Sequence, residues 1–224
     1  MAERKTIIAI SGSTRRLSTN LHLIQAIIGL YQDRLDIEVF QHLADLPHFN
    51  PDLDTDNPPP AVASLRQQLH DADGILICTP EYAMGVPGTL KNAIDWTVSS
   101  MEFSHKPVAL ITASSSGEKG HRALMESLKV LEAELPDSSQ LVISFAGTKI
   151  KDGKITDGDT LSRVIRVMDS LIKNIDERTR EDRGKIEPSI SLDSGSGLMR
   201  NRVDVLEDVC VGKKVVPRRS PTTW

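Results

Sequence analysis

Short apolar runs rich in β-branched residues recur along the chain. They lie at residues 6–10, 37–40, 74–78, 108–113 and 141–145. Each run is hydrophobic at nearly every position rather than at every second one, which is typical of a strand that is covered on both faces. The pattern therefore predicts five buried strands.

The segments between these runs carry apolar residues at helical spacing, which predicts five helices. The third helix is predicted over residues 89–100 and the last over residues 161–175. The five predicted stripes are Leu21, Ile24, Ile27, Ile28 and Tyr31; Val62, Leu65 and Leu69; Leu90, Ile94 and Val98; Leu124, Leu128, Leu131 and Leu135; and Leu161, Ile165, Met168, Ile172 and Ile175. Strands that alternate with helices form right-handed βαβ units. We therefore predict an α/β fold, a doubly wound five-stranded parallel sheet of order 2-1-3-4-5 with helices on both faces.

The alternating pattern stops at about Asp182. A chain of 224 residues with 39% hydrophobic and 26% charged residues can bury one sizeable core. The segment 183–224 mixes Gly, Ser, Pro and charged residues with one short apolar patch at 203–211. We predict one domain over residues 1–182 and a C-terminal extension over residues 183–224 that is flexible or packs on a partner subunit.

Composition and charge argue against several classes of partner. A net charge of -4 gives no basic field that would gather nucleic acid. No apolar run approaches the roughly 20 residues that span a bilayer, and the first apolar stretch is too short for a secretory signal. Cys78 and Cys210 are too far apart for a disulfide framework, and the six histidines show no ligand-like spacing. We expect a cytoplasmic protein with no nucleic-acid partner, no membrane contact and no metal.

The turn after the first predicted strand is rich in hydrogen-bond donors. Its polar side chains are Ser11, Ser13, Thr14, Arg15, Arg16, Ser18, Thr19 and Asn20. In a doubly wound sheet this turn aims helix N–H groups at a ligand beyond the strand ends. Side-chain donors with a single glycine suit a monophosphate, and neither G-x-G-x-x-G nor the Walker lysine is present. Capping of the next helix by Ser18 or Thr19 would explain one of these residues but not the set.

Two further loops are predicted at the same edge of the sheet. The loop that begins at Cys78 is shaped by prolines and glycines, and Tyr82 and Met84 add apolar surface on which a planar ring could lie. At its far end Trp96 is interpreted as helix core and Lys91 as a solvated side chain. After the fourth strand, the small residues Ser114, Ser115, Ser116 and Gly117 could meet the polar edge of the same ring.

These motifs resemble the NADPH-dependent FMN reductase family of flavodoxin-like proteins, which includes bacterial quinone, chromate and azo-dye reductases. The pattern S-x-R-x-x-S-x-N is met by Ser13, Arg15, Ser18 and Asn20, and P-E-Y-x-x-x-x-P-G-x-L-K-N-A-I-D-W by residues 80–96. The likeness covers about residues 4–176. Two residues depart from the family's P-E-Y-N-x-S pattern, since Ala83 and Gly85 replace its Asn and Ser.

The resemblance implies an oxidoreductase that takes hydride from NADPH, with NADH possible, onto bound FMN and passes electrons to a quinone, free flavin, azo dye or metal oxyanion. No side chain is expected to be catalytic, because the flavin carries the chemistry. The cofactor-binding residues that it implies are Ser11, Ser13, Arg15, Ser18, Thr19 and Asn20 at the FMN phosphate; Pro80, Glu81, Tyr82, Ala83, Met84, Gly85 and Val86 along the isoalloxazine; and Ser114, Ser115, Ser116 and Gly117 at its pyrimidine side. The family also implies a homodimer or homotetramer.

Three other functions compete with this interpretation. A flavodoxin-type electron carrier without its own NAD(P)H turnover fits poorly with the balanced charge and the 4% aromatic content. A low-molecular-weight tyrosine phosphatase would need arginine six residues after Cys78, where Met84 stands. A family member that has lost its flavin and serves as a scaffold stays open because of Ala83 and Gly85.

Overall fold

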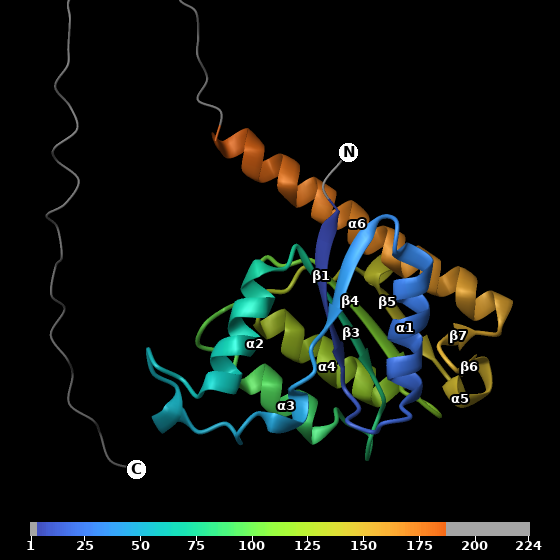
Figure 1. The fold of residues 1–224 in the computed structure, drawn as a ribbon, viewed down its shortest axis with the longest axis horizontal. Helices are drawn as coiled ribbons and strands as arrows, with labels where there is room; N and C mark the ends of the chain where they lie inside the picture. Colours follow the sequence, from blue (N-terminus) through green and yellow to red (C-terminus); the bar gives the residue numbers. More distant parts are fainter. Residues whose placement is uncertain (1–3, 187–224) are drawn as a thin grey trace, which may run out of the picture. The chain divides into compact units, whose positions relative to one another are not determined.

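A five-stranded parallel sheet lies at the centre of the computed structural model, which describes residues 4–186 (Figure 1). Its strands are β1 (Lys5–Ser11), β2 (Leu35–Val39), β3 (Gly74–Thr79), β4 (Val108–Ala113) and β5 (Gln140–Ile143). They follow the order β2-β1-β3-β4-β5, and every neighbouring pair is parallel. The flavodoxin-like α/β fold predicted from the sequence is therefore confirmed.

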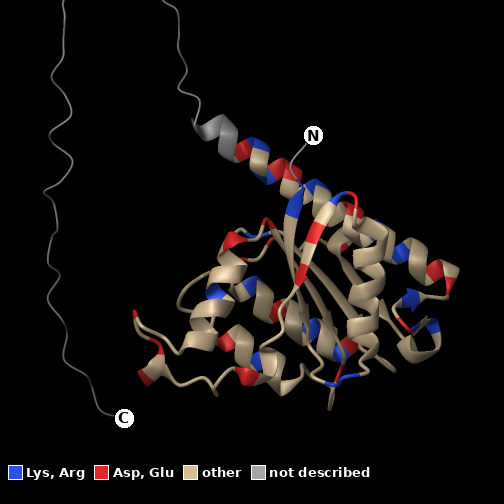
Figure 2. Ribbon diagram, viewed as in Figure 1, with Lys and Arg blue, Asp and Glu red and all other residues tan. Residues whose placement is uncertain are grey.

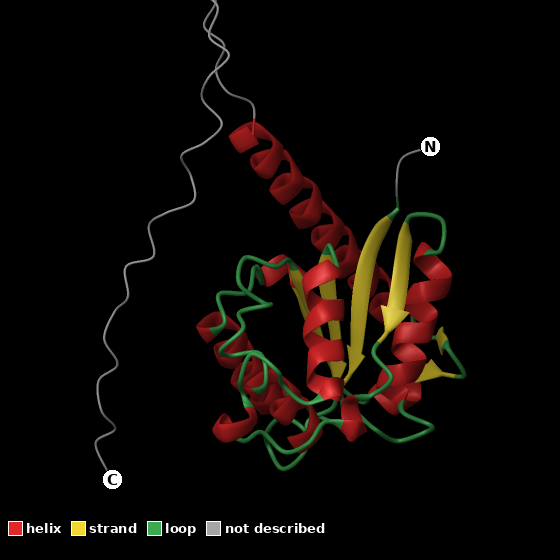
Figure 3. Ribbon diagram, turned by 60° about the vertical axis from the view of Figure 1, so that its left-hand side comes forward, coloured by secondary structure: helices red, strands yellow, loops and turns green. Residues whose placement is uncertain are grey.

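Helices cover both faces of the sheet (Figure 3). They are α1 (Thr19–Tyr31), α2 (Pro60–Asp71), α3 (Gly88–Asp95), α4 (Glu118–Val130), α5 (Ala146–Lys149) and α6 (Gly158–Ile186). Two cores result: α1 and α6 pack on one face, and α2, α3 and α4 on the other. Because side chains alternate along a strand, Ile7 and Ala9 enter the first core, while Ile8 and Ile10 enter the second.

The central strands match the prediction of coverage on both faces. Every residue of β3 and β4 is buried, and neither strand carries a charged side chain. The edge strand β2 instead alternates between buried or half-buried and exposed positions and carries Asp36 and Glu38. Figure 2 shows the same contrast, with charged residues on the helices and on β2 rather than on β3 and β4.

Three helices differ at their ends from the prediction. The helix α3 ends at Asp95, where the Thr97 N–H donates to the Ile94 carbonyl instead of continuing the helix, so Val98 is exposed. The helix α4 ends before Leu135 because Glu132, at a φ of 58°, takes the left-handed conformation of a Schellman motif. The helix α6 is longer than predicted at both ends.

The region after β5 also differs from the prediction. The strand ends at Ile143, so Phe145 is not part of it. A hairpin of β6 (Ile150–Lys151) and β7 (Lys154–Ile155) follows α5 and packs beside α1. Its turn residues Asp152 and Gly153 both have positive φ, the type I′ geometry that an Asp-Gly pair favours.

Two short 3₁₀ helices lie in the loop between β2 and α2, at Leu43–Asp45 and Pro51–Leu53. Within the described residues, no helix is long and apolar enough to cross a membrane. The predicted extension over residues 183–224 lies, from Glu187 on, outside the described part of the chain.

Candidate functional site

A cavity of about 370 Å³ opens at the carboxyl edge of the sheet. Four loops line it, one after each of β1, β3, β4 and β5. The lining residues are Ser13, Arg15, Ser18, Thr19 and Asn20; Pro80 and Tyr82; Ala113, Ser114 and Ser115; and Phe145, Ala146, Gly147 and Thr148. Its volume is in the range of small-molecule sites, and its position is where open α/β sheets bind ligands.

The cavity brings together part of the predicted cofactor set. The predicted residues that line it are Ser13, Arg15, Ser18, Thr19, Asn20, Pro80, Tyr82, Ser114 and Ser115. The others lie outside its lining, namely Ser11, Glu81, Ala83, Met84, Gly85, Val86, Ser116 and Gly117. The roles of both groups toward a cofactor stay predictions.

The turn after β1 is organised by its own side chains. Ser18 is the N-cap of α1, and its Oγ accepts a hydrogen bond from the Asn20 N–H at 3.2 Å. The Ser11 hydroxyl donates to the Ser13 carbonyl at 3.1 Å, within the same turn. A Cβ on Gly12 would lie 2.7 Å from the Thr79 Cβ, so glycine is needed where β1 and β3 meet. Ser18 therefore caps α1 through its hydroxyl oxygen, and its hydroxyl proton can still donate a hydrogen bond.

Asn20 carries an unpartnered polar atom at the cavity. Its side chain is 2% exposed, and its Nδ2 donates to the Ala113 carbonyl at 3.1 Å. Its Oδ1 has no hydrogen-bond partner among the described residues. Buried acceptors are seldom left unpaired in folded proteins, and this one belongs to a residue that lines the cavity, where a ligand could supply a hydroxyl or N–H donor.

Ser114 joins three of the loops around the cavity. Its Oγ accepts from the Glu81 N–H at 3.2 Å, its N–H donates to the Ile143 carbonyl at 3.1 Å, and its carbonyl accepts from the Ala146 N–H at 3.0 Å. The Phe145 N–H adds a bond to the Ser115 carbonyl at 3.2 Å. The Ser114 hydroxyl thus ties the loop after β3 to the loop after β4, and backbone hydrogen bonds tie the loop after β4 to the loop after β5.

Glu81 faces helix α4. Its Oε2 accepts from the Gly120 N–H at 2.7 Å, in the first turn of that helix. The N-cap of α4 is Gly117, which has no side chain to satisfy this turn, so Glu81 serves as the cap from another loop. A Cβ on Gly120 would lie 2.9 Å from the Gly85 carbonyl oxygen, which shows how closely the loop after β3 approaches α4.

The two departures from the family pattern lie in one tight turn. The Tyr82 N–H donates to the Gly85 carbonyl at 3.1 Å, and the Gly85 N–H to the Tyr82 carbonyl at 2.9 Å. Between them Ala83 and Met84 have φ of 48° and 61°, the type I′ geometry. Asn is several times more common than Ala in this conformation, so the replacement at position 83 strains the backbone in addition to removing an amide group.

The second half of the long motif, residues 88–96, does not line the cavity but supports the loop between β2 and α2. The Asn92 Nδ2 and the Trp96 Nε1 both donate to the Pro47 carbonyl, at 2.9 and 2.8 Å. The Phe49 N–H donates to the Asn92 Oδ1 at 2.7 Å, and the Phe49 ring meets the Trp96 ring edge-on, with centroids 5.0 Å apart. Trp96 is fully buried, as the sequence predicted.

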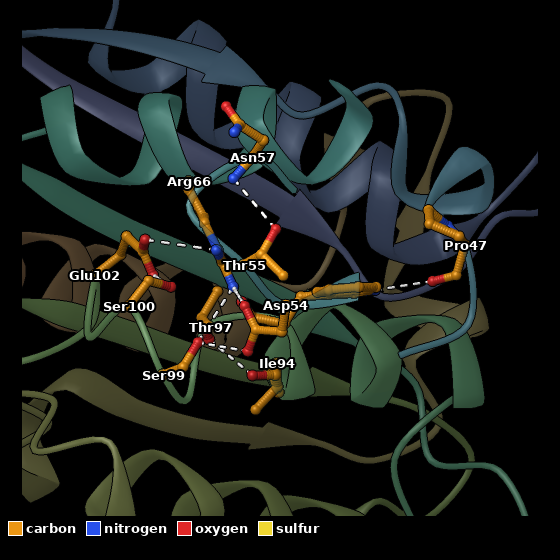
Figure 4. Close-up of polar contacts among 11 residues, drawn as sticks. Pro47, Asp54, Thr55, Asn57, Arg66, Ile94, Thr97, Ser99, Ser100 and Glu102 are labelled. Atoms are coloured by element: carbon orange, nitrogen blue, oxygen red, sulfur yellow. Dashed lines mark hydrogen bonds and ion pairs between the residues drawn. The ribbon is translucent and has the colours of Figure 1, made fainter. Parts of the chain in front are cut away.

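A partly buried ionic cluster holds the same loop, between β2 and α2, at Asp54 (Figure 4). The Arg66 Nη2 lies 2.7 Å from the Asp54 Oδ1, and the Arg66 Nε donates to the Trp96 carbonyl at 3.0 Å. The Ser99 hydroxyl donates to the Asp54 Oδ2 at 2.6 Å. The bonds from Ser99 and Arg66 hold the pKa of Asp54 below its ordinary value. Nothing in the sequence analysis predicted this cluster.

Sequence reasoning missed one wall of the cavity. Residues 145–148 line it, yet they were interpreted as the end of a strand and the residues after it. The topology could have indicated this wall. In open α/β sheets ligands bind beyond the carboxyl ends of the strands, and β5 ends at the same edge as β1, β3 and β4.

Metal and thiol chemistry find no support here. In the described part of the chain, no group of three His, Cys, Asp or Glu side chains is placed to hold a metal ion. Cys78 is fully buried in β3, and burial raises the pKa of its thiol, which makes it unreactive.

Comparison with known proteins gives consistent matches. The NAD(P)H-dependent FMN reductase of Pseudomonas aeruginosa is 36% identical over 151 residues, which are 65% of this chain and 81% of that protein. The quinone reductase of Escherichia coli is 29% identical over 172 residues, 73% of this chain and 92% of that protein. Among solved structures, the flavoenzyme FerB of Paracoccus denitrificans, an NAD(P)H:(acceptor) oxidoreductase, is 28% identical with a TM-score of 0.66, over 77% of this chain and 98% of that one.

The model of one protein family also matches, under the description NADPH-dependent FMN reductase. The match spans residues 6–147, which run from β1 into the fourth loop of the cavity and include both sequence motifs. The chain therefore belongs to the NADPH-dependent FMN reductase family of oxidoreductases.

Proposed function

We propose that the cavity binds FMN and that the protein passes reducing equivalents from NAD(P)H through FMN to a second acceptor. The observation that carries this proposal is the buried, unpartnered Oδ1 of Asn20 at a cavity whose first loop holds hydroxyl and guanidinium donors. FMN offers hydroxyl groups that can donate to Asn20 and a phosphate that can accept from the loop. The residues present thus fit the cofactor.

The residues of the first loop would hold the phosphate. Arg15 supplies a positive charge, and the Ser18 hydroxyl can donate while its oxygen accepts from the Asn20 N–H. The N-terminus of α1 adds the favourable end of a helix dipole. Pro80 and Tyr82 on one wall and Ser114 and Ser115 on another would orient the isoalloxazine ring.

When bound, FMN supplies the chemistry, by accepting a hydride and releasing electrons to the acceptor. The protein's part is to bind the ring, fix its orientation and leave one face open to NAD(P)H and then to the acceptor. The ionisable side chains among the described lining residues are Arg15 and Tyr82, and neither is needed to move a proton. This division of roles agrees with the expectation that no side chain is catalytic.

The relatives support a broad range of acceptors, because one is named for FMN and another for quinones. We propose that the acceptor is a quinone, free flavin, azo dye or metal oxyanion, with NADPH preferred over NADH. The same proposal includes a homodimer or homotetramer, a cytoplasmic location and a C-terminal extension that starts at residue 183.

The deciding experiment is an anaerobic visible spectrum of the purified protein, reconstituted with FMN, before and after addition of NADPH. Bound flavin that loses its absorbance on addition of NADPH supports the proposal. Flavin that binds but keeps its absorbance favours the electron carrier, since a carrier lacks its own NAD(P)H turnover. A protein that binds no flavin would instead be a scaffold that has lost the chemistry.

A further inference from the structure

Phe145 combines three properties that the fold alone does not explain. It stands just beyond β5 with a φ of 55°, its side chain is 69% exposed, and it lines the cavity. A bulky residue in the left-handed region is a genuine outlier, and such residues persist only where the surrounding structure holds them. They are most frequent at ligand sites.

Backbone hydrogen bonds on both sides fix this conformation. The Phe145 N–H donates to the Ser115 carbonyl at 3.2 Å. The Phe145 carbonyl accepts from the Thr148 N–H at 3.0 Å and from the Thr148 hydroxyl at 2.8 Å. The same backbone could be held with glycine at this position, and more easily, because glycine adopts positive φ without strain. The phenylalanine ring is therefore not required by the local fold.

The ring is not required by either core. Both cores are formed by buried residues, and Phe145 belongs to neither. An exposed aromatic ring at the wall of a cavity offers a large apolar surface that a ligand can cover. The other lining residues are small or polar apart from Pro80 and Tyr82, so the Phe145 ring adds a large apolar surface to the lining formed by the loop after β5.

We propose that Phe145 is a flavin-contact residue that closes the β5 side of the cavity and slows the release of FMN. This inference rests on the proposed function, because it takes the flavin as the occupant. The ring carries no ionisable group, so it acts on affinity and dissociation rate rather than on hydride transfer. It lies outside both sequence motifs, and its contribution is separate from that of the phosphate loop.

The test compares Phe145→Ala and Phe145→Gly with the unsubstituted chain and with Val130→Ala. Val130 is 75% exposed at the end of α4 and does not line the cavity, so its substitution controls for the loss of an exposed apolar side chain. FMN binding to each apoprotein is measured by fluorescence titration, the dissociation rate by dilution into excess riboflavin, and thermal unfolding is recorded without flavin.

Both substitutions at Phe145 are expected to raise the Kd for FMN about tenfold, mainly through faster dissociation, while Val130→Ala leaves it unchanged. Without flavin, Phe145→Gly is expected to unfold about 2–4 °C above Phe145→Ala, because glycine relieves the strain. If Phe145 were purely structural, its substitution would lower stability and FMN affinity together. Here Phe145→Gly is expected to be more stable than Phe145→Ala although both bind FMN more weakly.

An unchanged Kd in Phe145→Ala, with the unsubstituted chain binding FMN, would overturn the inference and leave the proposed function intact. If Phe145→Ala changes the oligomeric state and leaves the Kd for FMN unchanged, the inference is also overturned, and Phe145 would instead contact a second copy of the chain. If the unsubstituted chain binds no FMN, the proposed function itself fails, and the inference fails with it.

Discussion

The carboxylate of Glu81 accepts a hydrogen bond from the Gly120 N–H at 2.7 Å, so a residue of the loop after β3 caps the helix after β4. The cap that a helix usually provides for itself is absent, because Gly117 stands at the N-cap position. This bond fastens the predicted flavin loop to α4, and the family's P-E-Y motif thus has a structural reason for its glutamate in this chain.

We expect Glu81→Ala to lower the free energy of unfolding by about 1 kcal/mol, a fall in Tm of about 2–4 °C. Glu81→Gln keeps an acceptor but loses the charge that favours a helix N-terminus, so its effect should be smaller. Glu118→Ala removes a carboxylate from the same first turn and serves as the control. Thermal unfolding that is equal in Glu81→Ala and the unsubstituted chain would show that the cap contributes nothing.

Arg15 and Arg16 give a matched pair for the phosphate assignment. Both are exposed neighbours in the same loop, but Arg15 lines the cavity and Arg16 does not. We expect Arg15→Ala to weaken FMN binding about tenfold, as loss of a charge-assisted hydrogen bond would, and Arg16→Ala to leave it unchanged. Fluorescence titration at two salt concentrations checks this, since the Arg15 contribution should shrink at high salt. Equal effects of the two substitutions would contradict a specific phosphate contact.

Much of the fold was predictable because the pattern of apolar residues is set by burial. The runs at β3 and β4 are apolar almost throughout since both faces of these strands are covered. Helix ends were harder, because Val98 and Leu135 continue the apolar spacing beyond the last helical turn. What ends α4 is the left-handed backbone of Glu132, a residue that carries no signal for it.

The site was predictable where donors cluster in sequence, as in the loop after β1. It was not predictable where the structure depends on contacts between distant loops. Ser114 joins loops that are more than 25 residues apart in the chain, and no local pattern reports such bonds. Phe145 was interpreted as a strand residue because it is apolar and follows β5, and its positive φ is visible only in the structure.

Position 83 should accept asparagine, the residue that the family pattern P-E-Y-N-x-S has there. Because Asn tolerates the left-handed region better than Ala, we expect Ala83→Asn to stabilise the protein by about 0.5–1 kcal/mol. Ala123, exposed in the middle of α4, gives the control, since Asn is a poorer helix former than Ala and Ala123→Asn should destabilise. Thermal unfolding of the two variants should therefore shift in opposite directions. A lower Tm for Ala83→Asn would argue against the type I′ turn.

The partly buried pair of Arg66 and Asp54 should contribute more than an exposed pair of the same chemistry. The two side chains are 14% and 11% exposed, whereas those of Arg34 and Asp169 are 57% and 49% exposed. Removing one partner of a fully buried pair costs about 3–5 kcal/mol, and this pair keeps some contact with water, so we expect Arg66→Met to cost about 2–3 kcal/mol. Arg34→Met should cost about 0–1 kcal/mol. Urea unfolding of both variants measures the difference, and similar costs would contradict the burial of the pair.

The same cluster predicts how stability depends on pH. Because the pKa of Asp54 is lowered in the folded state, its ionised form stabilises the fold. This contribution is fully present above the unfolded pKa of about 3.9 and is lost as the pH falls through the folded pKa. Asp54→Asn lacks the contribution at every pH. The difference in unfolding free energy between Asp54→Asn and the unsubstituted chain should therefore be constant from pH 7 to about pH 5 and shrink below about pH 4. A difference that stays constant down to pH 3 would mean that the carboxylate of Asp54 does not titrate with folding.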